Sequence, residues 1–184
     1  MKIIETRTAP NARRVRIFLA EKGLELEREH RELDSLRSPE FTKLNPYQRV
    51  PILVLDDGTV IAETIAICRY LEELRPEPAL FGRGALGKAR VEMQHRRVEF
   101  GLYLFVQAAF RHLHPSMVAL EAPQIPAWGE ANKGKALAAL ELLDQQLATT
   151  RYLAGDDYSV ADITALVIVD FMRPARIARP PELI

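Results

Sequence analysis

Two short segments, Val50-Pro51 and Glu63-Thr64, carry groups that together can hold a short peptide with a charged end. A Val-Pro step entering a strand can contain a cis proline and leave the Val50 amide and carbonyl ready to pair with an extended peptide. Glu63 and Thr64 open a predicted helix, where spare backbone amides and the helix dipole attract a carboxylate. An ordinary edge-strand proline and simple helix capping are the alternative explanations.

The elements before these segments follow the order strand, helix, strand. Apolar periodicity predicts a strand over residues 1–6, a helix over 11–22 that stops at Gly23, and a strand over 24–33. Parallel pairing of the two strands completes a βαβ unit. A short helix is expected at 39–43 after a polar bend.

The following elements form a hairpin and a helix. Ile52-Leu53-Val54-Leu55 is a predicted buried strand, Asp57-Gly58 is a two-residue turn, and residues 59–61 form the antiparallel partner. The helix over 63–75 ends at Pro76. The order βαβ then ββα is that of a thioredoxin-like α/β domain.

The rest of the chain is predicted to be entirely helical. Residues 77–87 are rich in Pro and Gly and suggest a linker between a domain at 1–76 and a domain at 88–184. Helices are expected over about 86–113, over 133–149 and after Ser159. Ser159 and Asp162 have the spacing of a helix capping box.

Bulk composition narrows the functional classes. The chain has 25 Lys plus Arg and 25 Asp plus Glu, so a nucleic-acid-binding or anionic-membrane surface is not expected. The N-terminus lacks the pattern of a signal peptide, and no apolar stretch approaches a membrane span, so we expect a cytoplasmic protein. The single cysteine, Cys68, lies in an apolar helical pattern and is interpreted as a packed side chain rather than a reactive thiol.

Four stretches in order resemble the cytosolic glutathione S-transferase family, in particular its bacterial serine/asparagine-like branch. They are residues 9–16, Asn45-Pro46 through Val50-Pro51, Glu63-Thr64 with Ala66-Ile67, and residues 159–163. The resemblance implies a thioredoxin-like domain that binds glutathione and an all-α domain that shapes a pocket for a second, apolar substrate. It also implies a cytoplasmic, homodimeric transferase of the detoxification type, with glutathione as co-substrate.

The resemblance assigns the parts of glutathione to individual residues. Val50 and Pro51 would bind the peptide backbone, Glu63 the γ-glutamyl ammonium, and Thr64 the γ-glutamyl carboxylate. Arg37 and Arg49 match positions used for the glycine carboxylate, although an exposed arginine is often simply solvated. Gln48 stands where relatives often have glycine, so the loop around it is expected to differ.

Activation of the glutathione thiol requires a donor in the loop before the first helix. The family position for a catalytic serine is Ala9 here, and a methyl group donates no hydrogen bond. Thr8 and Asn11 are the candidates to replace it, and Asn11 equally suits a helix cap. Asn11 matches the asparagine of a bacterial branch that handles disulfides and peroxides.

The second-substrate pocket is assigned to Ala9, Tyr103, Phe110 and His114, with core packing as the alternative for the aromatic side chains. The histidines lack the spacing of a metal site, so no metal is expected. The chain ends where the family continues with further helices, so we expect a helical domain shortened at its C-terminus and a more open pocket.

Three functions follow from these residues. The first is conjugation of glutathione to small electrophiles. The second is a glutathione-dependent disulfide reductase or peroxidase, favoured by Asn11 and the missing serine. The third is a noncatalytic glutathione-binding module, favoured by Ala9.

Overall fold

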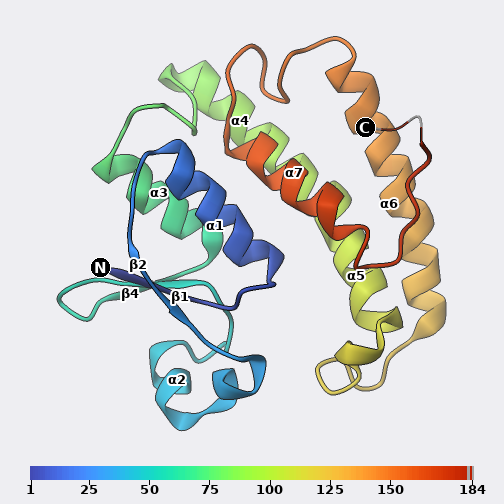
Figure 1. The fold of residues 1–184 in the computed structure, drawn as a ribbon. Coiled ribbons are helices and arrows are strands. Elements are labelled where there is room, and N and C mark those ends of the chain that lie inside the picture. Colours follow the sequence, from blue (N-terminus) through green and yellow to red (C-terminus); the bar gives the residue numbers. More distant parts are fainter. Residues whose placement is uncertain (182, 184) are drawn as a thin grey trace. The chain divides into compact units, whose positions relative to one another are not determined.

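The computed structural model describes residues 1–181 and 183 (Figure 1). By its internal contacts the chain divides into two compact units, Met1–Leu80 and a second unit from Phe81 onward. Helix α4 already begins at Gly84, so the end of the segment 77–87 that the sequence predicts as a linker is helical. Residues 182 and 184 of the predicted domain 88–184 lie outside the described residues.

The first unit contains a four-stranded mixed sheet. Its strands are β1 (Lys2–Glu5), β2 (Glu27–His30), β3 (Ile52–Val54) and β4 (Val60–Ala62), in the spatial order β2-β1-β3-β4. β1 pairs with β2 in parallel, and β3 pairs antiparallel with both β1 and β4. The predicted βαβ-ββα order of a thioredoxin-like domain is confirmed.

β2 is much shorter than the predicted strand over 24–33. Gly23 has a φ of 59°, and the Leu24 amide donates to the Leu19 carbonyl at 2.9 Å. Leu24 therefore still belongs to the C-terminal cap of the preceding helix, as expected for a helix that ends on a left-handed glycine. The strand can begin only after this cap.

Helices cover both faces of the sheet (Figure 1). α1 (Pro10–Glu21) and α3 (Thr64–Leu74) pack against each other on one face. The 3₁₀ helix Leu33–Arg37 and α2 (Pro39–Leu44) lie on the other, where Leu36 and Phe41 pack on Ile4 and Ile52. The apolar cores on both faces hold the strand ends in fixed positions.

The second unit is helical, as predicted. α4 (Gly84–Val98) continues through a π-helical turn (Glu99–Tyr103) into α5 (Leu104–Leu113). α6 (Pro126–Leu147) packs on α5, and α7 (Val160–Phe171) packs on α4. α6 begins earlier than the predicted residue 133 because Pro126 occupies the first helical turn, where proline is compatible with a helix.

The predicted capping box starts α7. Asp162 Oδ2 accepts hydrogen bonds from the Ser159 amide at 2.9 Å and from the Ser159 hydroxyl at 2.7 Å. Its other oxygen accepts from the Leu153 amide at 2.8 Å, which ties the preceding loop to the helix. None of the helices in the described part of the chain combines the length and the apolar character needed to cross a membrane.

Candidate functional site

The topology of the first unit brings three predicted site segments to one edge of the sheet. Ile4 near the end of β1 is in register with Ile52 at the start of β3, and Ile52 is in register with Ala62 at the end of β4. The loop after β1, the Val50-Pro51 step and the Glu63-Thr64 step therefore share this edge. Residues far apart in the sequence are placed together by strand pairing.

The Val50-Pro51 step enters β3 through a braced loop. The peptide bond between the two residues is cis, as the sequence suggested. Buried Asn45 donates from Nδ2 to the Arg49 carbonyl at 2.9 Å and accepts the Tyr47 amide on Oδ1 at 3.1 Å. Within the described residues, the Val50 amide and carbonyl make no hydrogen bond to other backbone groups. The backbone of Val50 is thus available to an added extended chain.

The loop also contains a strained residue. Gln48 has a φ of 54°, the left-handed region that favours glycine, and its Nε2 donates to the Thr42 hydroxyl at 3.2 Å. This explains why glycine suits the position. In this chain the position is occupied by glutamine, and the side-chain hydrogen bond from Gln48 to Thr42 of α2 holds the loop in this conformation.

Glu63 and Thr64 form a second strained feature at the start of α3. Glu63 has φ 67° and ψ 123°, a conformation that costs a residue with a side chain about 1–3 kcal/mol and occurs most often at functional sites. Its exposed side chain caps no amide of the helix among the residues described, so capping does not explain it. The first amides of α3 have no acceptor within the helix. α3 begins at the same edge of the sheet as Val50.

Thr64 is buried, and its hydroxyl has a partner that the sequence did not reveal. Nη1 of buried Arg14 in α1 donates to Thr64 Oγ1 at 2.8 Å. The two residues lie 50 positions apart in the chain, so nothing in the local pattern marks them as a pair. This bond fixes the start of α3 against α1.

The two predicted thiol-activating residues lie in the loop between β1 and α1 (Thr8) and in the first turn of α1 (Asn11). The N-cap position of α1 is Ala9, and Asn11 is the second helical residue, so the interpretation of Asn11 as the helix cap is wrong. Asn11 is half-buried and Thr8 is exposed. The loop is braced by Arg16, which forms an ion pair with buried Glu5 at 3.2 Å and donates to the Arg7 carbonyl at 3.1 Å.

Arg37 and Arg49 lie in the two segments next to this edge. Arg37 is the last residue of the 3₁₀ helix, Arg49 belongs to the braced loop, and both are exposed. Each can reach solvent or a bound anion, and their assignment to the glycine carboxylate stays a prediction.

Two of the three predicted residues of the second unit, Phe110 and His114, form an aromatic cluster with Phe171. The Phe110 ring stacks on His114 with centroids 4.9 Å apart and meets Phe171 edge-on at the same centroid distance. The Tyr103 hydroxyl accepts from Gln107 at 3.3 Å. His114 also accepts the Ser116 amide at 3.2 Å, so its ring has a capping role. The assignment of Ala9, Tyr103, Phe110 and His114 to one pocket stays a prediction.

The described residues include no group of three His, Cys, Asp or Glu side chains that could hold a metal ion. The His112 side chain, for example, accepts a hydrogen bond from the Ile125 amide at 3.0 Å and so stabilises the connection between α5 and α6.

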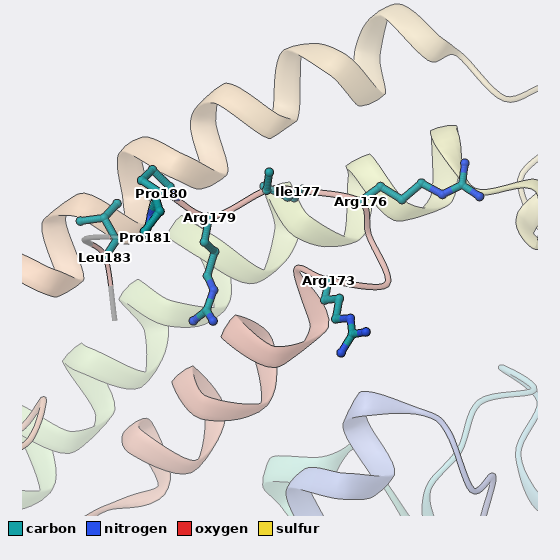
Figure 2. A pocket seen from close by; sticks show the side chains of 8 residues that line it. Arg173, Arg176, Ile177, Arg179, Pro180, Pro181 and Leu183 are labelled. Carbon is teal, nitrogen blue, oxygen red and sulfur yellow. The ribbon is translucent and has the colours of Figure 1, made fainter.

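A cavity of about 480 Å³ lies beside the chain segment that follows α7. It is lined by residues that the sequence did not single out: Arg173, Arg176, Ile177, Ala178, Arg179, Pro180, Pro181 and Leu183. Figure 2 shows the Arg176 side chain extending away from those of Arg173 and Arg179. The three arginines therefore do not converge on one point.

Cys68 does not take part in the site. It is fully buried in α3, and this burial raises the pKa of its thiol to about 12, while Arg14 lowers and Glu72 raises the pKa by smaller amounts. The interpretation as a packed side chain is confirmed.

Because the Cys68 thiol stays protonated up to pH 9, a thiol reagent such as dithionitrobenzoate is expected not to label the native protein. Labelling should appear only with denaturant, in parallel with unfolding followed by circular dichroism. Stoichiometric labelling of the native protein at pH 8 within minutes would contradict this arrangement.

Comparison with known proteins identifies the family. Residues 8–74 match the model of the glutathione S-transferase N-terminal domain, and residues 126–183 match that of the C-terminal domain. Glutathione S-transferase 2 of Saccharomyces cerevisiae is 35% identical over 187 residues, covering 99% of this chain and 80% of that protein. A maleylacetoacetate isomerase of Pseudomonas aeruginosa is 31% identical, covering 89% of this chain and 77% of that protein.

A solved structure agrees with these matches. The crystal structure of a glutathione S-transferase domain-containing protein from Marinobacter aquaeolei has a TM-score of 0.94 and 37% identity, covering 99% of this chain and 91% of that one. The matches span both units and all of the segments at the shared edge of the sheet. The chain therefore belongs to the glutathione S-transferase family of enzymes.

Proposed function

We propose that this enzyme binds glutathione on residues 1–76 and activates its thiol for attack on small, largely apolar electrophiles held by residues 88–184. The observation that carries this proposal is that Val50, Glu63 and Thr64 meet at one edge of the sheet. Among the residues that the structure describes, the Val50 backbone groups have no backbone partner, and the first amides of α3 have no acceptor within the helix. The combination suits an extended peptide with a charged end.

Each part of the tripeptide has a complementary group in this arrangement. The backbone of glutathione pairs with Val50 beside Pro51, the γ-glutamyl ammonium meets the Glu63 carboxylate, and the γ-glutamyl carboxylate meets Thr64 and the amides of α3. Arg37 and Arg49 offer positive charge to the glycine carboxylate. The strained backbone of Glu63 supports this role, because the strain has no use in capping the helix.

The reaction begins with the thiol. A free cysteine thiol has a pKa of about 8.5, and a donor to the sulfur beside a helix N-terminus lowers it, so more thiolate is present at neutral pH. Asn11 in the first turn of α1 is the proposed donor, with Thr8 as the rival. The thiolate attacks an electrophilic carbon, a carbon–sulfur bond forms, and the leaving group departs with its electron pair.

A glutathione-dependent disulfide reductase or peroxidase is the second candidate. It is favoured by the alanine at the family's serine position, Ala9, together with Asn11. Here the thiolate attacks a disulfide sulfur, and the displaced thiolate leaves; a second glutathione then resolves the mixed disulfide, giving oxidised glutathione. A glutathione-dependent isomerase is a further candidate, because one relative carries the name maleylacetoacetate isomerase.

Turnover with three substrates separates these functions. We propose assays with a chlorinated nitroaromatic, with hydroxyethyl disulfide and with maleylacetoacetate, alongside calorimetric titration with glutathione. Activity with the nitroaromatic supports conjugation, and activity with the disulfide alone supports the reductase. Binding of glutathione without turnover supports a noncatalytic module.

The same titration tests the binding site. Thr64→Val should weaken glutathione binding about 10-fold or more through loss of a hydrogen bond to a charged group. Thr59→Val is the matched control, since Thr59 is an exposed residue beside the turn before β4. No heat of binding by the unmodified protein at millimolar glutathione would refute the proposed function.

We also propose the homodimeric assembly and cytoplasmic setting that the family resemblance implies. A row of exposed apolar side chains supports the dimer: Leu86, Met93 and Phe100 recur at intervals of seven along α4 and the π turn, and Phe100 is 58% exposed. Exposed apolar rows of this kind mark association surfaces.

Met93→Glu combined with Phe100→Glu is expected to convert the dimer into a monomer. In a two-fold interface each change occurs twice, so the dissociation constant should rise at least about 100-fold. Sedimentation analysis measures the result. Leu142→Glu on α6 is the control, because Leu142 is 68% exposed and lies outside the row. A dimer that survives the double change would place the interface elsewhere.

A further inference from the structure

Arg14 is a charged side chain that is buried in the first unit. It lies on α1 with 1% of its surface exposed, and a guanidinium stays charged under all conditions in proteins. Arginine is almost never fully buried unless it is hydrogen-bonded and paired. Its Nη1 donates to Thr64 Oγ1 at 2.8 Å, inside the unit.

The chemistry of this bond fixes the direction of the Thr64 hydroxyl proton. A guanidinium has only donors, whereas a hydroxyl has one donor and two acceptor positions. Thr64 Oγ1 must therefore be the acceptor toward Arg14, and its own proton must point to another group. Without Arg14 the hydroxyl could rotate and accept from a different neighbour.

Other donors gather at the place in the fold where Thr64 lies. Thr64 is the first residue of α3, and the amides of the first turn have no acceptor within the helix. The positive end of the helix dipole lies at the same point. A charged donor behind the hydroxyl polarises it and strengthens the bond that it gives to an anion.

We infer that Arg14 is a positioning residue, which turns the Thr64 hydroxyl proton toward the α-carboxylate of the γ-glutamyl group without touching glutathione itself. The inference rests on the proposed function, since it takes Thr64 as a ligand of that carboxylate. Arg14 lies three residues after Asn11, so the two side chains share a face of α1. One helix thereby serves both the thiol end and the carboxylate end of a single ligand.

A purely structural role is the competing explanation. Arg14 on α1 lies close enough to Cys68 on α3 to lower the pKa of its thiol, and it could simply fill the contact between α1 and α3. Loss of a structural contact should weaken the binding of every ligand of the site to the same extent. Loss of a positioning bond should weaken the binding only of ligands that carry the carboxylate.

The test compares two ligands, glutathione and 4-aminobutyryl-cysteinyl-glycine, which lacks only that carboxylate. The unmodified protein should prefer glutathione by about 10- to 100-fold, the range expected of charge-assisted hydrogen bonds. Arg14→Met should weaken glutathione binding about 10-fold and leave binding of the analogue unchanged within about twofold. Arg14→Met with Thr64→Val should bind glutathione no more weakly than Thr64→Val alone, because both changes remove one coupled interaction.

Calorimetry at a temperature where urea unfolding shows every variant to be folded provides these values. Should Arg14→Met fail to fold, Arg14→Lys provides the same comparison, because lysine keeps the charge but lacks the planar fork, and a selective loss of at least threefold is expected. Equal weakening of both ligands, or unchanged glutathione binding, would overturn the inference. So would an unmodified protein that binds both ligands equally. If the unmodified protein binds neither ligand, the proposed function fails instead.

Discussion

Replacing Asn11 with alanine is expected to lower turnover with the chlorinated nitroaromatic about 10- to 1000-fold, by analogy with loss of one oriented donor at an anionic centre. Affinity for glutathione should stay largely intact, because the proposed contacts to the peptide are at Val50, Glu63 and Thr64. The geometry favours this role, since Ala9 takes the N-cap position and leaves the half-buried Asn11 side chain to other partners.

The pH dependence sharpens the expectation. A donor to the sulfur stabilises the thiolate and lowers the pKa of the bound thiol, so removal of the donor raises that pKa. The deficit of Asn11→Ala should therefore shrink as the pH rises from 6.5 toward 9, where more thiolate forms without assistance. Turnover measured at saturating glutathione across this range shows the shift.

Thr8→Val is the matched variant for this experiment. Thr8 is exposed and precedes the helix, so its loss should leave turnover within about twofold if Asn11 is the donor. A large loss of turnover with Thr8→Val and none with Asn11→Ala would identify Thr8 as the donor to the thiol. Unchanged turnover in both variants would mean that backbone amides of α1 alone activate the sulfur.

Much of the fold was predictable because its signals are local. The Asp57-Gly58 turn is an example: Gly58 has a φ of 86°, and Asp57 accepts the Thr59 amide at 2.8 Å, so the turn depends on adjacent residues only. The capping box of Ser159 and Asp162 is local in the same sense. Errors arose where a residue permits two structures, as at Pro126, which breaks a helix interior but suits a helix start.

The site was predictable only in part. Strand order and family resemblance together indicate Val50, Glu63 and Thr64, yet neither indicates the side chains that hold them. Arg14 and Asn45 are polar residues whose burial depends on partners brought close by folding, and a charged residue in a helix otherwise suggests a surface position. Asn45 carried a weak signal as an asparagine beside a proline in a turn-rich segment.

Lys22→Met is expected to cause the largest loss of stability in the first unit. Lys22 is completely buried, forms an ion pair with Glu72, and donates to the backbone carbonyls of Pro76, at 3.3 Å, and Pro78. Removing one partner of a buried ion pair costs about 3–5 kcal/mol. Because m-values in urea are about 1–3 kcal/mol/M, the unfolding midpoint should fall by at least about 1 M.

Two comparisons make this expectation specific. Lys2→Met also removes a lysine–glutamate pair, Lys2 with Glu29 at 2.6 Å, but at the surface, so it should change the midpoint far less. Lys22→Met combined with Glu72→Leu replaces the buried pair by apolar groups and should recover part of the lost stability. Equal midpoint shifts for Lys22→Met and Lys2→Met would show that burial contributes nothing to this pair. In that case the hydrogen bonds from Lys22 to the carbonyls of Pro76 and Pro78 would not be needed to hold the end of the first unit in place.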